Sequence, residues 1–536
     1  MRIFATRARR IAAATLVSAP FIGFGGLSAY IQYRKRTKPQ PHMFRPMVDD
    51  NGDLQLEGRV VPRPSTMSVV VRAIHLVLLF VPLAFLYVFM SLRSDWYHVW
   101  INLLLKAVQR AGPVFVKIGQ WSCTREDLFS PEVRQVFKRL YNEVDVHPYE
   151  ASLQILSEEL GRPALEVFES IDEKTVGSGS IGQVHLAKLK GSSRRVVIKV
   201  MHPGIIETIV RDFTILNNLA DFADRYIPGL SRFDLPELSL AFTSHLAAQL
   251  DFRVEAENLE AFRRNFGKEP YVEFPEPLLS TQRMLVETFC EGEPASPEFL
   301  RTLPVHARDT IANKGLNTWC QMLLRDNFIH GDMHPGNILI DASDSHNPTI
   351  TLIDVGLCQQ LTPEESKIAH NLMESFVRWN PAQCADSLWN MGRHQRYADK
   401  ETFEANLTEL FKHFRPTRGD KQAVTNILQA IFETVRQDNV HMDPAFVSLL
   451  FAVLVLESFI MNLNPEYDMV RHTAPWLVTE GHISKGVVKN LAKSARDNLL
   501  RDYYIWSGRM EDTMELERLE ASSENIRVSN ADTSFW

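Results

Sequence analysis

Cysteine is scarce in this sequence, and its spacing excludes two common kinds of site. Five cysteines stand at positions 123, 290, 320, 358 and 384 of the 536 residues, and no two of them form a CxxC pair. A disulfide framework or a structural zinc site needs cysteines at short, paired spacings. We therefore expect neither, and we expect these lone cysteines to be small residues of the core.

A surplus of positive charge is also missing. The chain carries 58 Lys and Arg residues against 65 Asp and Glu residues, which gives a net charge of -7. Proteins that bind nucleic acid generally neutralise its phosphates with a basic surface, so we expect no nucleic-acid partner. The hydrophobic content of 45% is ordinary for a globular protein with a large core, and the length predicts two or three structural units.

Acidic residues are absent from the first 48 positions, where nine basic residues occur. This Arg-, Ala- and Ser-rich stretch with spaced apolar residues is typical of a mitochondrial transit peptide, which we assign to residues 1–45. A disordered basic arm and a secretory signal are the alternatives. Pro20 and three nearby glycines weaken the stretch as a continuous apolar helix. Residues 46–72 are rich in proline and charge and are predicted to be a linker.

Residues 73–92 contain no formal charge and lie between Arg72 and Arg93. A helix of this length covers about 30 Å, the thickness of a bilayer's hydrocarbon core, so we predict a single transmembrane helix. The alternative is a buried helix of the protein core. More basic residues precede the segment than closely follow it. The positive-inside rule then places the N-terminus in the mitochondrial matrix and the rest of the chain in the intermembrane space, anchored in the inner membrane.

A glycine-rich hairpin is predicted after a helical region that spans residues 98–170. The pattern GxGxxGxV predicts a strand, a tight turn and a second strand, and Lys199 lies on the next strand. Glycines let the backbone approach phosphate oxygens, and a strand lysine pairs with the α and β phosphates of a nucleotide. A dinucleotide-binding turn would lead into a helix instead. The nucleotide-binding residues predicted from the hairpin are Gly177, Ser178, Gly179, Ser180, Ile181, Gly182, Gln183 and Val184.

Residues 247–266 have the apolar spacing of a helix, and Glu255 lies within it. We predict that the Glu255 carboxylate pairs with Lys199 and positions its ammonium, as in kinases. The alternative for Glu255 is a solvated surface charge, because this helix has many acids. A strand is predicted at 284–289, followed by a link at 290–292 to a second, mainly helical part.

The segment His330-Gly-Asp-Met-His-Pro-Gly-Asn337 is predicted to be a catalytic loop between buried strands. Asp332 would accept or orient the proton of an attacking hydroxyl group or water, and Asn337 and Asp354 would hold Mg²⁺ on the phosphates of ATP. We expect His330 to brace the loop, and His334 either to brace it as well or to cap the turn before Pro335. Neither histidine is assigned chemistry.

An APE sequence and a long activation segment are both missing after Asp354-Val-Gly356, since a helix is predicted soon after Pro363. This argues against an ordinary protein kinase, which docks peptides on that segment. The phrase HGDMHPGN is also similar to small-molecule phosphotransferases. The apolar stretch 446–463 is predicted to be a core helix rather than a second span, because it contains Glu457. Residues 486–536 are predicted to be a polar tail.

These motifs together resemble the UbiB family of aarF-domain-containing atypical kinases. The resemblance covers roughly residues 100–480 and includes Lys117-Ile-Gly-Gln120, the hairpin, the helix around Glu255 and the loop HGDMHPGN. The leader and the apolar helix are similar to those of its mitochondrial members. The resemblance implies an α+β, protein-kinase-like bilobal fold with an added helical N-terminal extension, preceded by the transmembrane helix. The extension would cover 98–170, the N-lobe 171–290 and the C-lobe 291–485.

The resemblance also implies a function. Lys117 and Gln120 would reach over the active site and restrict it, so that ATP is hydrolysed or used on a lipid or quinone-related small molecule rather than on protein. Family members support coenzyme Q biosynthesis or distribution and lipid homeostasis. Two departures are present: a glycine-rich hairpin stands where many relatives have alanines, and Gln249 stands where many have a glutamate. A pseudokinase scaffold and a small-molecule phosphotransferase remain as alternatives.

Overall fold

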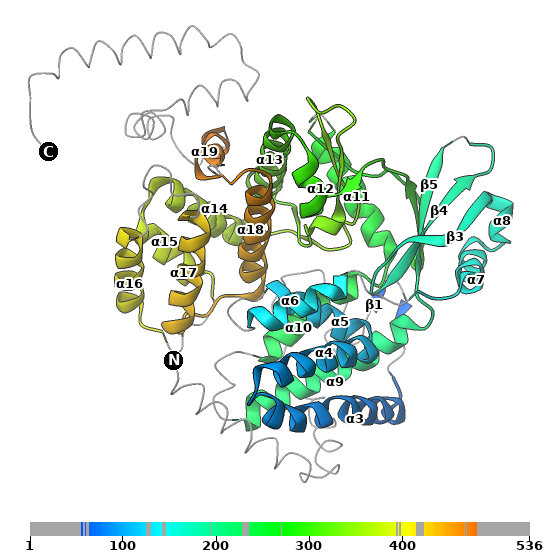
Figure 1. Ribbon diagram of the computed structural model, residues 1–536, viewed down its shortest axis with the longest axis horizontal. Helices are drawn as coiled ribbons and strands as arrows, with labels where there is room; N and C mark the ends of the chain where they lie inside the picture. The colour runs from blue at the N-terminus through cyan, green and yellow to red at the C-terminus, as the bar shows by residue number, and fades with distance from the viewer. Residues whose placement is uncertain are drawn as a thin grey trace, which may run out of the picture. The chain divides into compact units, whose positions relative to one another are not determined.

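The structure is a computed structural model, which describes most of the chain in two compact units (Figure 1). The first unit comprises Met1–Arg264, Pro275–Cys290 and Asp354–Leu357, and the second comprises the remaining residues. The described residues are 64–124, 130–141, 146–192, 194–227, 235–267, 269, 271–392, 395, 398–413, 423–465, 467 and 469–479, with the backbone of 55–56 and 59–60. The predicted transit peptide and polar tail lie outside them.

Helices dominate the start of the first unit, as predicted for residues 98–160. They are α3 (Thr66–Met90), α4 (Ser94–Ala111), α5 (Pro113–Thr124), α6 (Pro131–Phe137) and the 3-10 turn η3 (Lys138–Tyr141). Their shared core contains Ile101, Leu105, Val108, Val116, Phe137 and Leu140. The helices α7 (Tyr149–Leu160) and α8 (Ala164–Val167) follow, and the first long strand begins directly afterwards at Phe168.

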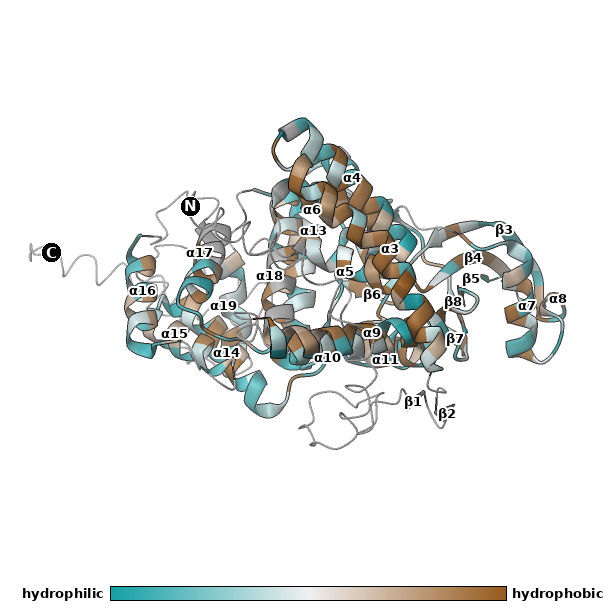
Figure 2. Ribbon diagram, turned by 90° about the horizontal axis from the view of Figure 1, so that it is seen from below, coloured by the Kyte–Doolittle hydropathy of each residue, from teal (hydrophilic) through white to brown (hydrophobic). Residues whose placement is uncertain are grey.

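Helix α3 begins seven residues before the predicted membrane segment 73–92 and ends at Met90, two residues before the predicted end. Ser65 caps its first turn by accepting a hydrogen bond from the Ser68 amide. Among the described residues it is the one helix long and apolar enough to cross a membrane, and only 11% of its most apolar window is buried. Most of α3 is brown in the hydropathy colouring of Figure 2. Its apolar side chains therefore need a cover that the described residues do not supply.

A five-stranded antiparallel sheet follows, with the order β3-β4-β5-β8-β7. Its strands are β3 (Phe168–Ser178), β4 (Gly182–Leu189), β5 (Arg195–Met201), β7 (Pro277–Ser280) and β8 (Met284–Thr288). Alternate residues of β5, namely Val196, Ile198 and Val200, pack with α7 in one core cluster. The opposite face of β5 therefore carries Val197 and Lys199. The predicted hairpin is confirmed, as are the predicted strand of Lys199 (β5) and the predicted strand at 284–289 (β8).

Three helices complete the first unit: α9 (Ile205–Tyr226), α10 (Leu235–Ala248) and α11 (Phe252–Phe266). The prediction of one helix from residue 247 is wrong at its start, because the chain breaks between α10 and α11. Asp251 accepts hydrogen bonds from the Arg253 amide and from its guanidinium group. A short acidic side chain that binds the backbone two residues ahead favours a new helix start over a continuous helix.

The second unit is mainly helical and has a small sheet of order β6-β12-β11-β9. The strands of this unit are β6 (Val272–Glu273), β9 (Glu293–Pro294), β10 (Ile329–His330), β11 (Ile338–Asp341), β12 (Thr349–Leu352) and β13 (Cys358–Gln359), and β10 and β13 form a separate pair. Its helices are α12 (Pro297–Thr302), α13 (Val305–Cys320), α14 (Pro363–Arg378), α15 (Pro381–Asn390), α16 (Lys400–His413), α17 (Ala423–Gln437), α18 (Pro444–Leu463) and α19 (Met469–Thr479).

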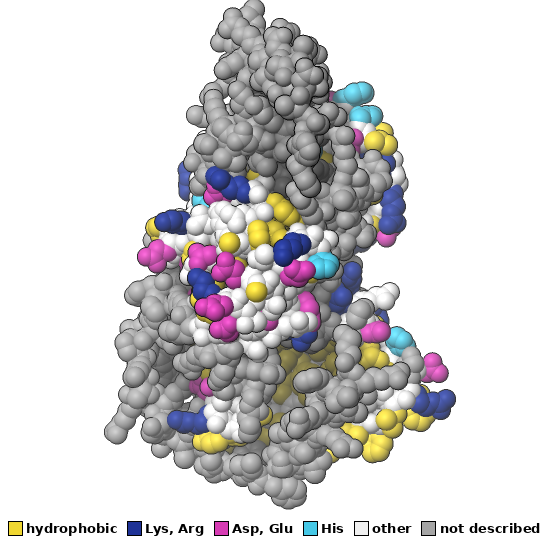
Figure 3. Space-filling model, turned by 90° about the vertical axis from the view of Figure 1, so that its left-hand side faces the viewer, with side chains coloured by type: hydrophobic (Ala, Val, Ile, Leu, Met, Phe, Trp, Pro, Cys, Tyr) yellow, Lys and Arg dark blue, Asp and Glu magenta, His cyan; other side chains and the backbone are white. Residues whose placement is uncertain are grey.

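Helix α18 is a core helix, as predicted. It contacts α13, and its residues Glu457, Ile460 and Leu463 are all buried. A glutamate 3% exposed within a packed apolar helix is consistent with a protein interior rather than with lipid. On the face drawn in Figure 3, basic and acidic side chains are intermingled rather than separated into patches of one sign.

Candidate active site

The turn of the glycine-rich hairpin joins β3 to β4. The Gly179 amide donates a hydrogen bond to the Gly182 carbonyl at 2.9 Å, which closes the turn. A Cβ on Gly182 would lie 2.5 Å from the Val200 carbonyl oxygen, so a side chain there would push β4 away from β5. A Cβ on Gly177 would meet nothing within 4 Å, and one on Gly179 would meet the Gly182 carbonyl oxygen at 3.7 Å, an ordinary contact distance. Gly182 is therefore required by the sheet, whereas the other two glycines leave room for a ligand.

Ser180 is the hairpin residue whose side chain best fits a phosphate. It is 7% exposed, and its hydroxyl group makes no hydrogen bond with any described residue. A buried hydroxyl without a partner costs free energy unless a ligand or water completes it. Its O–H group could donate to a phosphate oxygen.

Gln183, by contrast, is used by the fold. Its side chain is fully buried, accepts a hydrogen bond from the His147 amide and donates to the Ser152 hydroxyl. The neighbouring Val184 lies opposite Lys199 in the β4–β5 register. Of this pair, Val184 is therefore the one whose side chain lies on the face that carries the lysine.

A chain of histidines connects the turn to the segment before α7. His202 contacts the Gly179 carbonyl at 2.9 Å and His147 at 2.7 Å, and His147 contacts Ser152, which also contacts His185. Burial lowers the pKa of His147 to about 4 and lowers the pKa values of His185 and His202. The network is therefore uncharged at neutral pH and positions the turn through neutral hydrogen bonds.

The predicted pair of Lys199 and Glu255 is present. The Lys199 ammonium on β5 donates to the Glu255 carboxylate on α11, and both side chains are largely buried. Glu255 is 5% exposed, so the solvated alternative for this residue is wrong. The ion pair holds the Lys199 ammonium on the face of the sheet where the hairpin residue Val184 also lies.

Asp354 belongs to the same cluster. Asn258 on α11 donates to the Val355 carbonyl at 2.9 Å, and Glu255 accepts a hydrogen bond from the Val355 amide. The Asp354 carboxylate caps its own turn by accepting from the Gly356 amide at 3.0 Å. A Cβ built on Gly356 would lie 3.3 Å from the Asp354 carboxylate and 3.8 Å from that of Glu255, so both acids border this glycine.

Glu287 on β8 is a third carboxylate at Lys199, and no sequence motif indicated it. It lies opposite Val197 in the β5–β8 register, is 2% exposed, and places Oε1 4.0 Å from the Lys199 ammonium. Its second oxygen has no hydrogen-bond partner among the described residues. The available signal was a single charge inside an otherwise apolar strand, Met284-Leu-Val-Glu-Thr288.

One lysine thus faces three acids. Burial by itself would lower the pKa of the Lys199 ammonium, but the carboxylates of Asp354, Glu255 and Glu287 outweigh it and raise that pKa. Burial raises the pKa of Glu287 to about 8 and that of Glu255 to about 7, and the Lys199 charge opposes both shifts. Glu255 keeps Lys199 as its direct partner, so we place the remaining proton on Glu287 at neutral pH.

The catalytic loop in the second unit is braced by its own backbone. His330 is fully buried and its Nδ1 accepts from the Asp332 amide at 3.0 Å, while His334 caps the following turn by accepting from the Gly336 amide. The role of His330 was predicted. For His334 the cap was one of two predicted roles, and the capped turn begins at Pro335 rather than before it. β10, which delivers the loop, pairs with β13.

Asn337 closes the loop. Its Nδ2 donates to the Asp332 carbonyl at 2.9 Å, which leaves the amide oxygen available as a ligand, and its backbone carbonyl accepts from the Ile353 amide. Asp354 directly follows Ile353 in the sequence. Amide and carboxylate oxygens are the ligands that Mg²⁺ prefers, so Asn337 and Asp354 each carry an oxygen of the right kind. That both hold one ion stays a prediction.

Lys117 and Gln120 lie on α5. Gln120 donates to the Leu140 carbonyl of η3 at 2.9 Å, so its amide nitrogen ties two parts of the extension together. A Cβ on Gly119 would collide with Leu140, which explains why glycine stands between them. Lys117 is half-buried. The reach of Lys117 and Gln120 over a nucleotide stays a prediction.

An antiparallel sheet with a glycine-rich turn and a lysine–glutamate pair, followed in the chain by the loop His330–Asn337, defines a kinase-like protein. The sequence profile of the ABC1 atypical kinase-like domain matches residues 139–388. A probable protein kinase UbiB of Marinobacter nauticus is 30% identical over 375 residues, which cover 69% of this chain and 68% of that protein. The chain therefore belongs to the ABC1, or UbiB, family of atypical kinases, and the predicted kinase-like α+β fold is confirmed.

Two eukaryotic relatives are also similar. A mitochondrial ABC1 family protein of Schizosaccharomyces pombe is 25% identical over 558 residues, which cover 87% of this chain and 79% of that protein. A probable serine/threonine-protein kinase of Dictyostelium discoideum is 27% identical over 452 residues, which cover 71% of this chain and 65% of that protein. The family thus includes mitochondrial members.

Proposed function

We propose that this protein is a Mg-ATP-dependent atypical kinase or ATPase that supports coenzyme Q biosynthesis or distribution and lipid homeostasis in mitochondria. The observation that carries the proposal is the cluster of Lys199, Glu255 and Asp354 within one unit, beside a turn with an unpartnered buried hydroxyl at Ser180. The printed names of bacterial UbiB and of mitochondrial ABC1 relatives support the biological setting.

In this proposal the residues divide the work. Lys199, held by Glu255, binds the α and β phosphates of ATP, and the backbone of the glycine-rich turn lies over the phosphate chain. Asp332 orients the hydroxyl group or water that attacks the γ-phosphate and accepts its proton. Mg²⁺ held by Asn337 and Asp354 would neutralise the charge that develops on the phosphates. The protein's contribution is positioning and charge rather than covalent chemistry.

A small-molecule acceptor, lipid or quinone-related, is favoured over a protein acceptor. Only residues 357–362 separate Asp354-Val-Gly356 from the first turn of α14, and they include the short strand β13. The segment on which protein kinases dock a peptide has no room there.

Membrane attachment through α3 is part of the proposal. Exposed apolar side chains, including Val77, Leu78 and Phe85, extend along this helix. We assign α3 to a single pass of the mitochondrial inner membrane, with the kinase domain in the intermembrane space, from the distribution of basic residues around it. Carbonate extraction of mitochondria tests insertion, and protease protection in mitoplasts tests the side. Release by carbonate or protection of the domain in mitoplasts would contradict these assignments.

The nucleotide assignment is tested with purified full-length protein. Mg-ATP should raise the melting temperature of the wild type but not of Asp354→Ala, while Asp386→Ala, an exposed aspartate of the second unit, should respond like the wild type. No shift in the wild type would contradict nucleotide binding. Rescue of null cells by the double variant Asp332→Asn, Asp354→Ala would instead indicate a scaffold, and a phosphorylated metabolite that appears with ATP would indicate a small-molecule phosphotransferase.

A further inference from the structure

A cavity of about 270 Å³ lies within the helical extension of the first unit. Four elements line it: α3 contributes Phe80, α4 contributes Val108, α5 contributes Phe115, Ile118, Gly119 and Ser122, and α6 contributes Phe137. Two of these residues, Ile118 and Gly119, belong to the Lys117–Gln120 motif. The cavity is partly open to the surface, and none of the predicted nucleotide or metal residues lines it.

The wall of this cavity has almost no polar side-chain atoms that could bind water. Six of the lining residues have no polar side-chain atom, and the seventh, Ser122, donates its hydroxyl to the Gly119 carbonyl at 2.6 Å within its own helix. A cavity retains water only where at least two polar partners are available. A hydrocarbon ligand is therefore the chemistry that this wall accepts.

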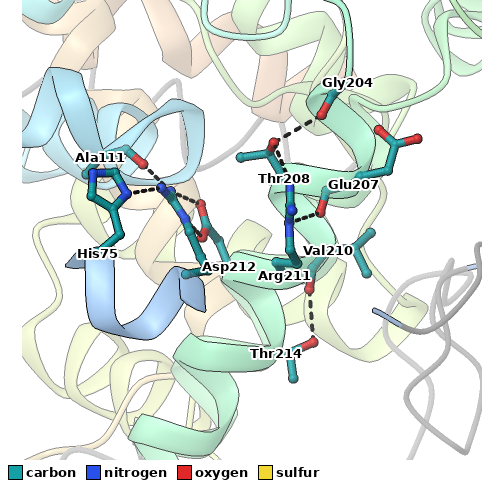
Figure 4. A network of polar contacts seen from close by, with 10 residues as sticks. His75, Ala111, Gly204, Glu207, Thr208, Val210, Arg211, Asp212 and Thr214 are labelled. Carbon is teal, nitrogen blue, oxygen red and sulfur yellow. Dashed lines mark hydrogen bonds and ion pairs between the residues drawn. The ribbon is translucent and has the colours of Figure 1, made fainter. Parts of the chain in front are cut away.

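The helices that enclose the cavity are tied at both ends of α3. Near its start, Arg72 donates to both oxygens of Asp212 on α9 at 2.7 and 2.8 Å, to the Ala111 carbonyl that ends α4, and contacts His75 (Figure 4). Near its end, the Trp100 indole donates to the Leu83 carbonyl at 2.8 Å. Phe80 lies between these ties, with its ring centroid 5.5 Å from that of Phe115. The cavity is thus a built part of the extension.

The opposite side of α3 is exposed and apolar. Leu78 and Phe89 are 69% and 64% exposed, and the exposed apolar residues continue on α4 with Trp96, Val99 and Leu103. A surface of this kind is covered by lipid when the proposed membrane attachment holds. Since α3 also contributes Phe80 to the lining, the cavity then lies one helix away from hydrocarbon.

We propose that this cavity binds the hydrocarbon tail of a membrane lipid. The inference rests on the proposed membrane attachment, because that attachment is the source of the tail. The cavity, at about 270 Å³, is large enough for a segment of such a tail, since an apolar cavity of roughly 150 Å³ already holds benzene. An acyl chain and an isoprenoid chain share this chemistry, and the experiment separates them.

The test uses the full-length protein in liposomes that contain trace amounts of one of two photoactivatable probes. One probe is a phosphatidylcholine with a diazirine in its acyl chain, and the other is a polyprenyl quinone with a diazirine in its tail. After irradiation, labelled residues are mapped by mass spectrometry. Labels on Phe115, Ile118 or Phe137 with either probe support the proposal and identify the source of the tail. Labels confined to the exposed residues Leu78, Phe85 and Phe89 overturn it.

A filled cavity supplies the second measurement. Val108→Phe adds a ring to the lining, and we expect it to lower labelling at the cavity residues by roughly tenfold, because a packed interior leaves no space for a second chain. Val71→Phe makes the same change on the exposed side of α3, where Val71 is 59% exposed, and should label like the wild type. Labelling of Val108→Phe at the wild-type level would contradict the proposal. Should Val108→Phe melt well below the wild type, the wild-type label map alone decides between the outcomes.

Liposome flotation of the same samples tests membrane attachment separately from tail binding in the cavity. Wild type and both variants should float equally, since neither substitution removes the apolar surface of α3. A wild type that stays with the soluble fraction would contradict membrane attachment. The wild-type protein would then be irradiated with the same probes in detergent micelles, where a label on the cavity residues supports the cavity as a tail site and its absence overturns it.

Discussion

Two buried ion pairs of the first unit differ in how completely their charges are matched. In the pair of Arg72 and Asp212, one guanidinium group binds both oxygens of one carboxylate, and a backbone carbonyl takes a further donor. In the pair of Lys199 and Glu255, the ammonium faces two further acids, Glu287 and Asp354, and one Glu287 oxygen has no partner among the described residues. The first pair is complete and holds helices together, while the second has spare negative charge and is suited to a cation and a ligand.

The largest effect is expected from breaking the complete pair. Asp212→Ala leaves the Arg72 guanidinium, 13% exposed, without its counter-charge, and loss of one partner of a buried pair typically costs about 3–5 kcal/mol. We expect a lower melting temperature and early release of α3, measured by hydrogen exchange of α3 and α9 in detergent. The double variant Arg72→Met, Asp212→Leu should recover much of the loss, because it removes both charges. Equal stability of Asp212→Ala and wild type would show that the pair contributes little.

The second effect concerns activity rather than stability. Asp354→Asn keeps the shape of the side chain but removes a negative charge, so we expect ATP hydrolysis to fall by about 100-fold or more, which corresponds to roughly 2.7 kcal/mol of transition-state stabilisation. Without nucleotide, its melting temperature should change little, because the substitution removes both the repulsion of Glu255 and Glu287 and the attraction to Lys199. If Asp354→Asn loses as much stability as Asp212→Ala, the proposed difference between the two ion pairs is contradicted.

The third effect is a pH dependence from Glu287. Its pKa of about 8 lies above the ordinary value of 4.5, so between these pH values the folded protein holds a proton that the unfolded chain has lost. Its contribution to the free energy of unfolding therefore falls as pH rises through this window, by up to about 1.4 kcal/mol per pH unit. Glu287→Gln should flatten that slope and keep Mg-ATP affinity above pH 8, where the wild type gains a charge beside Lys199.

Glu276→Gln is the matched control for this measurement, because Glu276 is 45% exposed in its ion pair with Arg194. Its pH profile should coincide with that of the wild type. A Glu287→Gln profile that also coincides with the wild type would mean that Glu287 does not titrate in this window.

The smallest effect is expected at an exposed pair. Lys400 and Asp386 in the second unit lie 2.8 Å apart, but their side chains are 47% and 60% exposed. Asp386→Ala should change the free energy of unfolding by less than about 1 kcal/mol, and the change should shrink further at high salt. Thermal denaturation at low and high ionic strength measures both. A loss as large as that of Asp212→Ala would show that burial is not what separates these pairs.

The parts of the site that are close in sequence could be predicted from it. The hairpin from Gly177 to Val184, the strand of Lys199 and the loop from His330 to Asn337 each follow from a spacing that constrains the local backbone. Glu255 was also predicted, because its partner belongs to the same motif set. The break at Asp251 was missed, since the apolar spacing continues across it and only the local hydrogen bond to Arg253 shows the new helix start.

Contacts between distant segments could not be predicted in this way. Glu287 reaches Lys199 because β8 pairs with β5, and Arg72 reaches Asp212 across 140 residues of chain. The histidine chain from His147 to His202 likewise joins residues that share no motif. Such partners are selected by packing of the whole unit, and a single sequence carries no local pattern for them.

The short segment 357–362 has a consequence for control of the enzyme by covalent modification. Many kinases are switched on when a phosphate on a flexible loop binds an arginine. Here Thr362 is the hydroxyl residue nearest to α14, and its side chain accepts from the Glu365 amide while Glu365 accepts from the Thr362 amide. A phosphate at Thr362 would break this reciprocal pair and meet both the negative charge of Glu365 and the free amides at the start of α14, so it would act on the helix start instead of ordering a loop. Switching by ligands, rather than by a protein kinase acting on this segment, is what the short connection permits.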